Sequence, residues 1–345
     1  MTPETNSPVS RVTVTPLSQD LSEKRFAVAV ENCDVDDKKA LVQYRNKWKQ
    51  WMSWYSYSAS EPHNIESQIH QMLFNDLTYR ATVSVRESSA SDAAISARSS
   101  TLAYLLDHGY VVSQVLALQK LLDDRKDVVS VKRFLKDVGK NRALITREIY
   151  VAGTGLPYDY SSWSAVVDET DPMVRMWGIE APGLSRFATS KFLHEAFDTL
   201  SGKKERERSR NDVIPKSIFK KLESWIGGPS AREIADIRNN FIAHAADGIR
   251  LGSAQFKGVK FSQIDDLQRA IVRVERALTD HVLSIRIGRN VVPSPPLGIF
   301  QGLDLPYAPS GSDTMMHRRW DDLRKERDRW KDGVLQDMTS ISAST

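Results

Sequence analysis

The segment 238–244, with the sequence RNNFIAH, places an arginine and a histidine six positions apart. The guanidinium of Arg238 is a permanently charged, planar fork of N–H donors that fits phosphate oxygens. His244 can exchange a proton near neutral pH and so act as a general acid or base. Asn239, directly after the arginine, can orient either partner. These three residues are therefore predicted to form a catalytic site that binds a phosphate and transfers a proton.

The segment lies in a predicted helix over 230–246 that Gly248 ends. At ~100° per residue, Arg238 and His244 flank the apolar stripe of this helix, one on each side and ~120° apart. Side chains so placed, and ~9 Å apart along the helix axis, rarely meet around one phosphate. A two-fold dimer would bring two such pairs together across a cleft, so the sequence predicts a homodimer. His244 also lies in the last helical turn, where the helix dipole favours the protonated imidazole of a general acid.

A structural interpretation fits the same residues. Arg238 would pair with an acid such as Glu233, because burying its charge beside the apolar stripe without a partner is costly. His244 would be a hydrogen-bonded histidine of the core. In that case the chain is a helical scaffold that has no nucleic-acid partner.

A second arginine–histidine pair, Arg276 and His281, has nearly the same spacing. Ala277 follows this arginine, where a polar residue is expected. His281 lies beside Val282 on the apolar stripe of a predicted helix over 262–287. We therefore interpret His281 as a core or interface histidine, with a place in the same cleft as the alternative.

The elements that must position these residues are helices. Strand-like alternation of apolar and polar residues is almost absent, so the predicted fold class is an all-α bundle of long helices. Gly139 can interrupt one of the predicted helices, and Pro215 suits the first position of another. Besides the two helices already given, apolar residues recur at helical spacing over 36–57, 64–87, 92–124, 127–150, 184–200, 215–228 and 315–335.

Changes in composition divide the chain into segments. The C-terminal helix carries Trp320 and Trp330 on one side, which need cover, so this helix is expected to dock or dimerise. The predicted segments are a disordered Ser/Thr/Pro-rich tail over 1–20, an N-terminal helical segment over 21–61, a main helical domain over 62–290 with a loop-rich insertion at 152–215, a Pro/Gly/Ser linker over 291–313, and a charged helix with its tail over 314–345.

The bulk composition is that of an ordinary globular chain, with 345 residues, 41% hydrophobic residues and 27% charged residues. The net charge of +4 permits a nucleic-acid partner without requiring one.

Cys33 is the only cysteine, which excludes an intrachain disulfide and a cysteine-based metal site and favours a reducing interior. With neither a long apolar stretch nor a secretion signal, the chain is expected to be cytoplasmic and without a membrane partner. Phosphate-loop, dinucleotide-binding and zinc-protease motifs are absent from the sequence, so no cofactor and no metal are expected.

Two further groups of residues are candidate RNA contacts. Lys203, Lys204 and Arg206 belong to a basic run that could follow an RNA backbone, although interleaved glutamates favour a solvated linker. Tyr158 and Trp163, in the long loop after the third long helical region, could stack on unpaired bases. The alternative is that these aromatic side chains pin the loop to the bundle.

The pattern of Arg238, Asn239 and His244 in a late helix of an all-α chain resembles the HEPN superfamily, a group of helical bundles with an arginine and a histidine at this spacing. The segments 237–244 and 146–159 are also similar to the abortive-infection, AbiU-like branch of that superfamily. The resemblance covers roughly residues 62–290.

The resemblance implies a metal-independent endoribonuclease that acts as a homodimer on RNA. The RNA 2′-hydroxyl would attack the adjacent phosphate and leave a cyclic phosphate end. Arg238 would stabilise the phosphate in the transition state, His244 would transfer a proton, and Asn239 would support them. Many members of the superfamily are toxins or antiphage effectors, so an antitoxin protein is an expected partner. Other members have lost catalysis, and the alternative is a module that binds RNA, a nucleotide or a protein.

Overall fold

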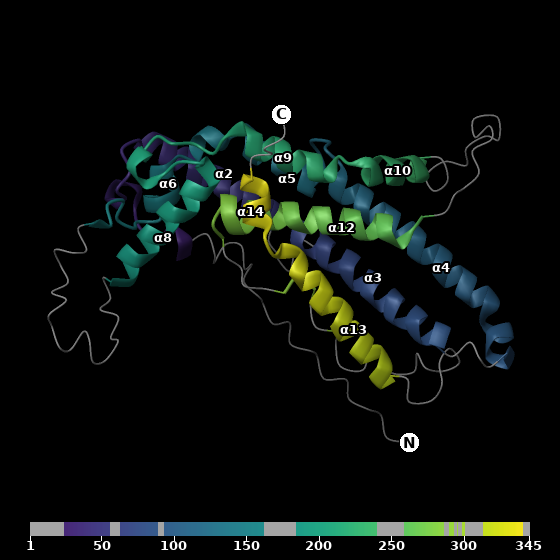
Figure 1. Ribbon diagram of the computed structural model, residues 1–345. Helices are drawn as coiled ribbons and strands as arrows, with labels where there is room; N and C mark the ends of the chain where they lie inside the picture. The colour runs from purple at the N-terminus through teal and green to yellow at the C-terminus, as the bar shows by residue number, and fades with distance from the viewer. Residues whose placement is uncertain are drawn as a thin grey trace, which may run out of the picture.

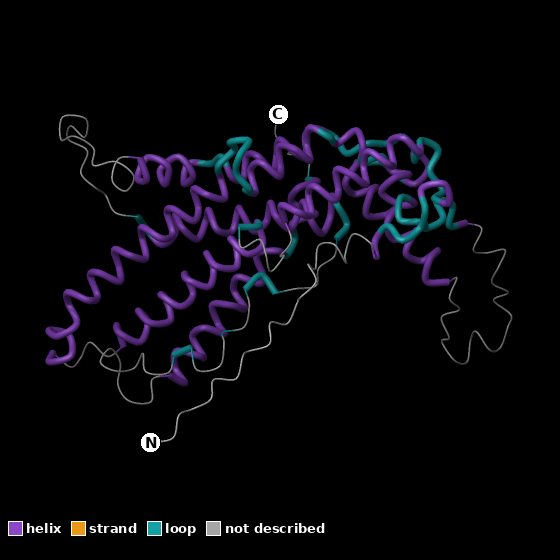
Figure 2. The backbone as a smooth tube through the Cα atoms, turned by 180° about the vertical axis from the view of Figure 1, so that it is seen from behind, coloured by secondary structure: helices purple, strands orange, loops and turns teal. Residues whose placement is uncertain are grey.

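The computed structural model describes residues 24–55, 63–88, 93–161, 184–239, 259–285, 290–292, 295, 299–300 and 313–340. Throughout these residues the chain forms helices and loops and no strand (Figures 1 and 2). The predicted all-α fold class is therefore confirmed. Residues His244 and Trp163 lie outside the described part of the chain, as does the predicted tail over 1–20.

The described elements follow the chain in an order close to the predicted one. They are η1 (Val30–Asn32), α2 (Lys38–Tyr55), α3 (Ile65–Ser88), α4 (Ala93–Leu122), α5 (Val131–Lys140), η2 (Arg142–Leu144), α6 (Arg147–Ala152), α8 (Leu184–Ser201), η4 (Glu205–Glu207), α9 (Lys216–Ile226), α10 (Pro229–Ile237), α12 (Phe261–Arg276), η6 (Ala277–Val282), α13 (Asp313–Asp328), η7 (Arg329–Lys331) and α14 (Val334–Thr339).

The long helices α3, α4, α12 and α13 run side by side along the molecule (Figure 1). Helix α12 contacts α4, α5, α9 and α10, so it forms the centre of the bundle. Its apolar stripe is buried as predicted, with Ile264, Leu267, Ile271 and Val274 in the core. Burying such stripes against one another is the main source of stability in a helical bundle.

The N-terminal helix α2 contributes to the same hydrophobic core as the rest of the bundle. Trp48 and Trp51 are fully buried, and the indole nitrogen of Trp51 donates a hydrogen bond of 2.7 Å to Asp137 on α5. The crowded tryptophans of this helix thus serve packing within the chain.

The C-terminal helix α13 packs on α3, which supplies the cover that its tryptophans need. Trp320 is buried, with its ring 5.3 Å from that of Phe74 on α3. Arg327 is also buried and contacts the carboxylates of Asp76 and Asp265 at 3.0 and 3.1 Å. A buried guanidinium with carboxylate partners on both α3 and α12 fixes the register of α13 against these helices.

The single helix predicted over 127–150 was wrong, because three short helices occupy this stretch. Gly139 does not cause the break: it lies inside α5, where the absence of a Cβ lets Phe219 of α9 approach closely. The chain turns instead at Asn141, and Thr146 caps the next helix by accepting from the backbone N–H of Ile149 at 3.4 Å. Local polar capping therefore overrides the helical periodicity here.

Candidate functional site

Helix α10 presents the first half of the predicted motif. It begins with Pro229 in its first turn, buries Ile234, and packs against α4 and α12. Arg238 and Asn239 follow the helix in π-helical geometry, a form that often occurs at functional sites. Because His244 lies outside the described residues, its predicted position relative to Arg238 stays a prediction.

The guanidinium of Arg238 is held by its neighbour in the chain. Its Nε and Nη2 donate to Oδ1 of Asn239 at 3.0 and 2.7 Å. Glu233, the predicted structural partner, instead accepts a hydrogen bond from Gln263 on α12. Within the described part of the chain, Arg238 is thus oriented by an amide oxygen and keeps its positive charge uncompensated.

Arg238 lies at a cavity of about 520 Å³ formed by the start of α3, the end of α4, the following loop and the end of α10. Its volume is within the range of small-molecule sites, ~300–1,000 Å³. The walls combine apolar and charged side chains: His63, Gln68, Leu116, Gln119, Lys120, Asp123, Arg125, Asp127, Val128, Val129 and Arg238.

The charged groups of this cavity leave a small positive excess, with three permanent cations against two carboxylates. Asp123 is satisfied locally, since its carboxylate accepts from the backbone N–H of Arg125 at 3.0 Å and from the Nε of Arg125 at 2.9 Å. Arg238 and Lys120 are thereby the cavity's main cations, opposed by Asp127. An oxyanion is the ligand that such a balance favours.

The second pair, Arg276 and His281, is built differently. Arg276 is buried and lies 3.3 Å from the carboxylate of Glu275 and 3.7 Å from that of Asp280. Burial raises the pKa of Glu275 to about 7, against the opposing effect of Arg276. The carbonyl oxygen of His281 accepts from the hydroxyl of Tyr150 at 2.8 Å. These contacts fit the structural interpretation of the second pair.

This second pair also lies at a π-helical segment. Residues Ala277–Val282 form η6, which ends with a hydrogen bond of 2.8 Å from the N–H of Leu283 to the carbonyl of Leu278. Ser284 follows with a φ of 49°, and Arg25 donates to its carbonyl oxygen at 2.9 Å. The predicted helix over 262–287 is therefore α-helical only to Arg276.

The candidate RNA contacts Lys203, Lys204 and Arg206 are exposed in the turn after α8. None of these residues lines the cavity at Arg238, and helix α8, which precedes them, lies at the opposite end of the molecule from α10 (Figure 1). Their role as RNA contacts stays a prediction.

Tyr158 is tied into the bundle on several sides. Arg210 lies over its ring at 4.2 Å, its N–H donates to Asp34 at 2.9 Å, and its carbonyl oxygen lies 2.8 Å from Nε2 of His194. Burial lowers the pKa of His194, which favours the neutral imidazole. These contacts fit the alternative in which Tyr158 pins the loop, and Trp163 lies outside the described residues.

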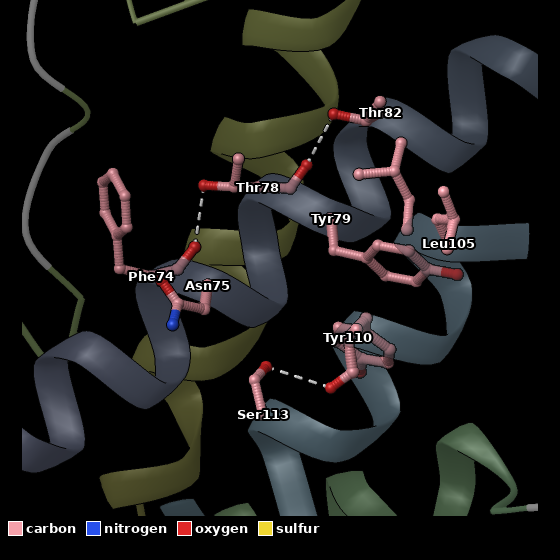
Figure 3. A pocket seen from close by; sticks show the side chains of 10 residues that line it. Phe74, Asn75, Thr78, Tyr79, Thr82, Leu105, Tyr110 and Ser113 are labelled. Atoms are coloured by element: carbon pink, nitrogen blue, oxygen red, sulfur yellow. Dashed lines mark hydrogen bonds between the residues drawn. The ribbon is translucent and has the colours of Figure 1, made fainter. Parts of the chain in front are cut away.

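A second cavity, of about 430 Å³, lies between α3 and α4 (Figure 3). The hydroxyls in its wall are all donors within the protein. Those of Thr78, Thr82 and Ser113 donate to backbone carbonyl oxygens of their own helices at 2.8–3.0 Å, and those of Tyr79 and Tyr110 each donate to an aspartate of the facing helix at 2.6 Å. Its lining residues include no charged side chain. Unlike the cavity at Arg238, it offers no cation to a phosphate.

Comparisons with protein families, with curated proteins and with solved structures find no match for this chain. No helix in the described ranges is both long and apolar enough to cross a membrane. The same ranges contain no group of three or more His, Cys, Asp or Glu side chains arranged to hold a metal ion.

Proposed function

We propose that the protein is a metal-independent endoribonuclease of the HEPN type, with Arg238, Asn239 and His244 as its catalytic residues. The observation that carries the proposal is the state of Arg238. Its guanidinium lies at a cavity, is oriented by Asn239, and has no carboxylate partner among the described residues. An arginine so held is available to an RNA phosphate.

In the proposed reaction the RNA 2′-hydroxyl gives its proton to a solvent water and its oxygen attacks the adjacent phosphorus. The bond from phosphorus to the 5′ oxygen breaks, which leaves a 2′,3′-cyclic phosphate and a 5′-hydroxyl. Arg238 stabilises the negative charge on the non-bridging phosphate oxygens, a contribution typical of fixed donors in active sites. His244 gives the leaving 5′ oxygen its proton.

The biological setting follows from the resemblance to the superfamily. We propose a cytoplasmic toxin or antiphage effector of the abortive-infection type, active as a homodimer and restrained by an antitoxin protein. The dimer would supply a second Arg238 and His244 across the cleft, as the two sides of the motif helix require.

A non-catalytic module that binds RNA, a nucleotide or a protein is the second candidate. The size of the cavity at Arg238, about 520 Å³, favours it, since a nucleotide fits such a volume. This candidate predicts binding without strand cleavage, and no special loss on replacing His244.

The test is induced expression of the wild type beside Arg238→Ala and His244→Ala, with growth and the integrity of total RNA as readouts. Circular dichroism establishes that each variant keeps its helical content. Degradation by the wild type and intact RNA with both folded variants supports the enzyme. Equal behaviour of the three proteins contradicts it and favours the binding module.

A further inference from the structure

The cavity at Arg238 contains two nitrogen donors that the proposed reaction does not use. His63 lies in the turn before α3, and Lys120 lies in the last turn of α4. Both side chains are exposed in the described structure, and Nζ of Lys120 lies 3.5 Å from Nδ1 of His63. His63 and Lys120, more than fifty positions apart in the sequence, thus lie together in the cavity beside Arg238.

The contact with Lys120 determines which nitrogen of the imidazole can serve a ligand. A lysine ammonium has only N–H donors, so Nδ1 of His63 must accept in this contact. The ring hydrogen of the neutral imidazole then resides on Nε2. In this contact His63 therefore offers an N–H donor at Nε2.

Hydrogen bonds hold the backbone of His63, and the contact with Lys120 orients its imidazole. The amide Nε2 of Gln68 donates to the carbonyl oxygen of His63 at 2.5 Å and to that of Val129 at 3.0 Å. The next residue, Asn64, caps α3 by accepting from the backbone N–H of Ser67 at 2.8 Å. Donors held in place before a ligand arrives lose less entropy when it binds.

We propose that His63 and Lys120 form a second phosphate-binding subsite, which holds the RNA phosphodiester next to the one at Arg238. This inference rests on the proposed function. Nε2–H of His63 donates to a non-bridging oxygen, and Lys120 adds a charge while it holds the imidazole in that tautomer. One cavity then grips two successive phosphates of an unpaired strand, because both groups line it together with Arg238.

The test is the binding of a short, fluorescein-labelled 2′-O-methyl RNA strand, which has no attacking hydroxyl and cannot be cleaved. Fluorescence anisotropy gives the Kd over a series of salt concentrations for the wild type, His63→Leu, His63→Gln and Lys120→Met. Lys49→Met is the matched control, since Lys49 is an exposed lysine on α2 and does not line the cavity.

We expect His63→Leu and Lys120→Met to raise the Kd about tenfold, as the loss of a charge-assisted contact does. His63→Gln, which keeps an N–H donor, is expected to restore most of the affinity. Lys120→Met also lowers the slope of log Kd against log salt by about 0.7, the value for one phosphate contact on a single strand. Lys49→Met changes neither quantity.

Two outcomes would overturn the subsite. If the wild type binds the strand and the cavity variants bind it as Lys49→Met does, the subsite is wrong and the proposed cleavage at Arg238 is unaffected. If the wild type shows no salt-dependent binding, the subsite is also wrong, and the cleavage assay on Arg238 and His244 decides the proposed function independently.

Discussion

The arginines of two arginine–histidine pairs with nearly equal spacing occupy opposite environments in this bundle. Arg238 lies beside a cavity, next to an asparagine and with no acid as a partner in the described structure. Arg276 is buried and pairs with Glu275 and Asp280. Both arginines adjoin π-helical residues, so helix geometry does not separate them. The partners of the guanidinium decide whether its charge serves a ligand or the fold.

The largest expected effect concerns the stability that the buried pair provides. At pH 8, above the pKa of Glu275, Arg276→Met leaves Glu275 and Asp280 without their counter-charge, so we expect the free energy of unfolding to fall by about 3–5 kcal/mol. Urea unfolding followed by circular dichroism measures the change. In the double variant Glu275→Gln/Arg276→Met most of this loss is recovered; an equal loss in both proteins would disprove the charge argument.

The pH dependence of the free energy of unfolding gives a second test of the buried pair, through its acid Glu275. Glu275 has an ordinary pKa of 4.5, and burial raises its pKa to about 7 in the folded chain. Between pH 4.5 and 7 the unfolded chain releases this proton while the folded chain keeps it. The contribution of Glu275 to stability therefore falls as the pH rises through this window, by on the order of 1–3 kcal/mol, and is constant above it.

Urea unfolding of the wild type and Glu275→Gln at a series of pH values measures this contribution. The other carboxyl groups titrate in both proteins, so the difference between the two curves isolates Glu275. A difference that does not change between pH 4.5 and 7 would show that Glu275 ionises normally in the bundle.

Asn239 provides a third comparison, since Ala277 occupies the equivalent position after Arg276. Asn239→Ala removes the acceptor that orients the guanidinium of Arg238, so we expect RNA cleavage to slow by about tenfold. A polar residue at the equivalent position of the second pair, Ala277→Ser, is expected to leave cleavage unaltered. Initial rates on a labelled RNA compare the variants, and unchanged cleavage by Asn239→Ala would remove Asn239 from the site.

The smallest effect is expected from the basic run after α8. Lys203 and Lys204 do not line the cavity at Arg238, and α8 lies at the opposite end of the molecule from α10, so we expect a short strand held at Arg238 not to contact them (Figure 1). The Lys203→Met/Lys204→Met variant should change the Kd for a short RNA by less than about twofold. A change as large as that expected for Lys120→Met would place these lysines at the binding site after all.

The fold class followed directly from the sequence, because apolar residues at helical spacing mark nearly every described helix. The break in the helix predicted over 127–150 could not be predicted from the sequence, because it depends on capping at Asn141 and Thr146 and on contacts from Asp212. The docking of α13 was indicated only by its uncovered tryptophans. The buried partners of Arg327 lie on helices distant in the sequence and carry no local signal.

The sequence likewise predicted only part of the candidate site. The motif identified Arg238 and Asn239, which the structure places together in hydrogen-bonding contact. It could not identify His63 or Lys120, because the cavity they share with Arg238 forms only when α3, α4 and α10 meet. The sequence also could not show that Lys203 lies outside the cavity at Arg238, because local composition does not determine which residues meet in the fold.

The central claim is that Arg238 serves a ligand and Arg276 serves the fold. The most direct test measures RNA cleavage and the free energy of unfolding on the same purified preparations of the wild type, Arg238→Ala and Arg276→Ala. We predict that Arg238→Ala loses at least about a hundredfold in cleavage rate at unchanged stability, and that Arg276→Ala loses stability but cleaves RNA while it remains folded. Cleavage by Arg238→Ala at the wild-type rate would contradict the account.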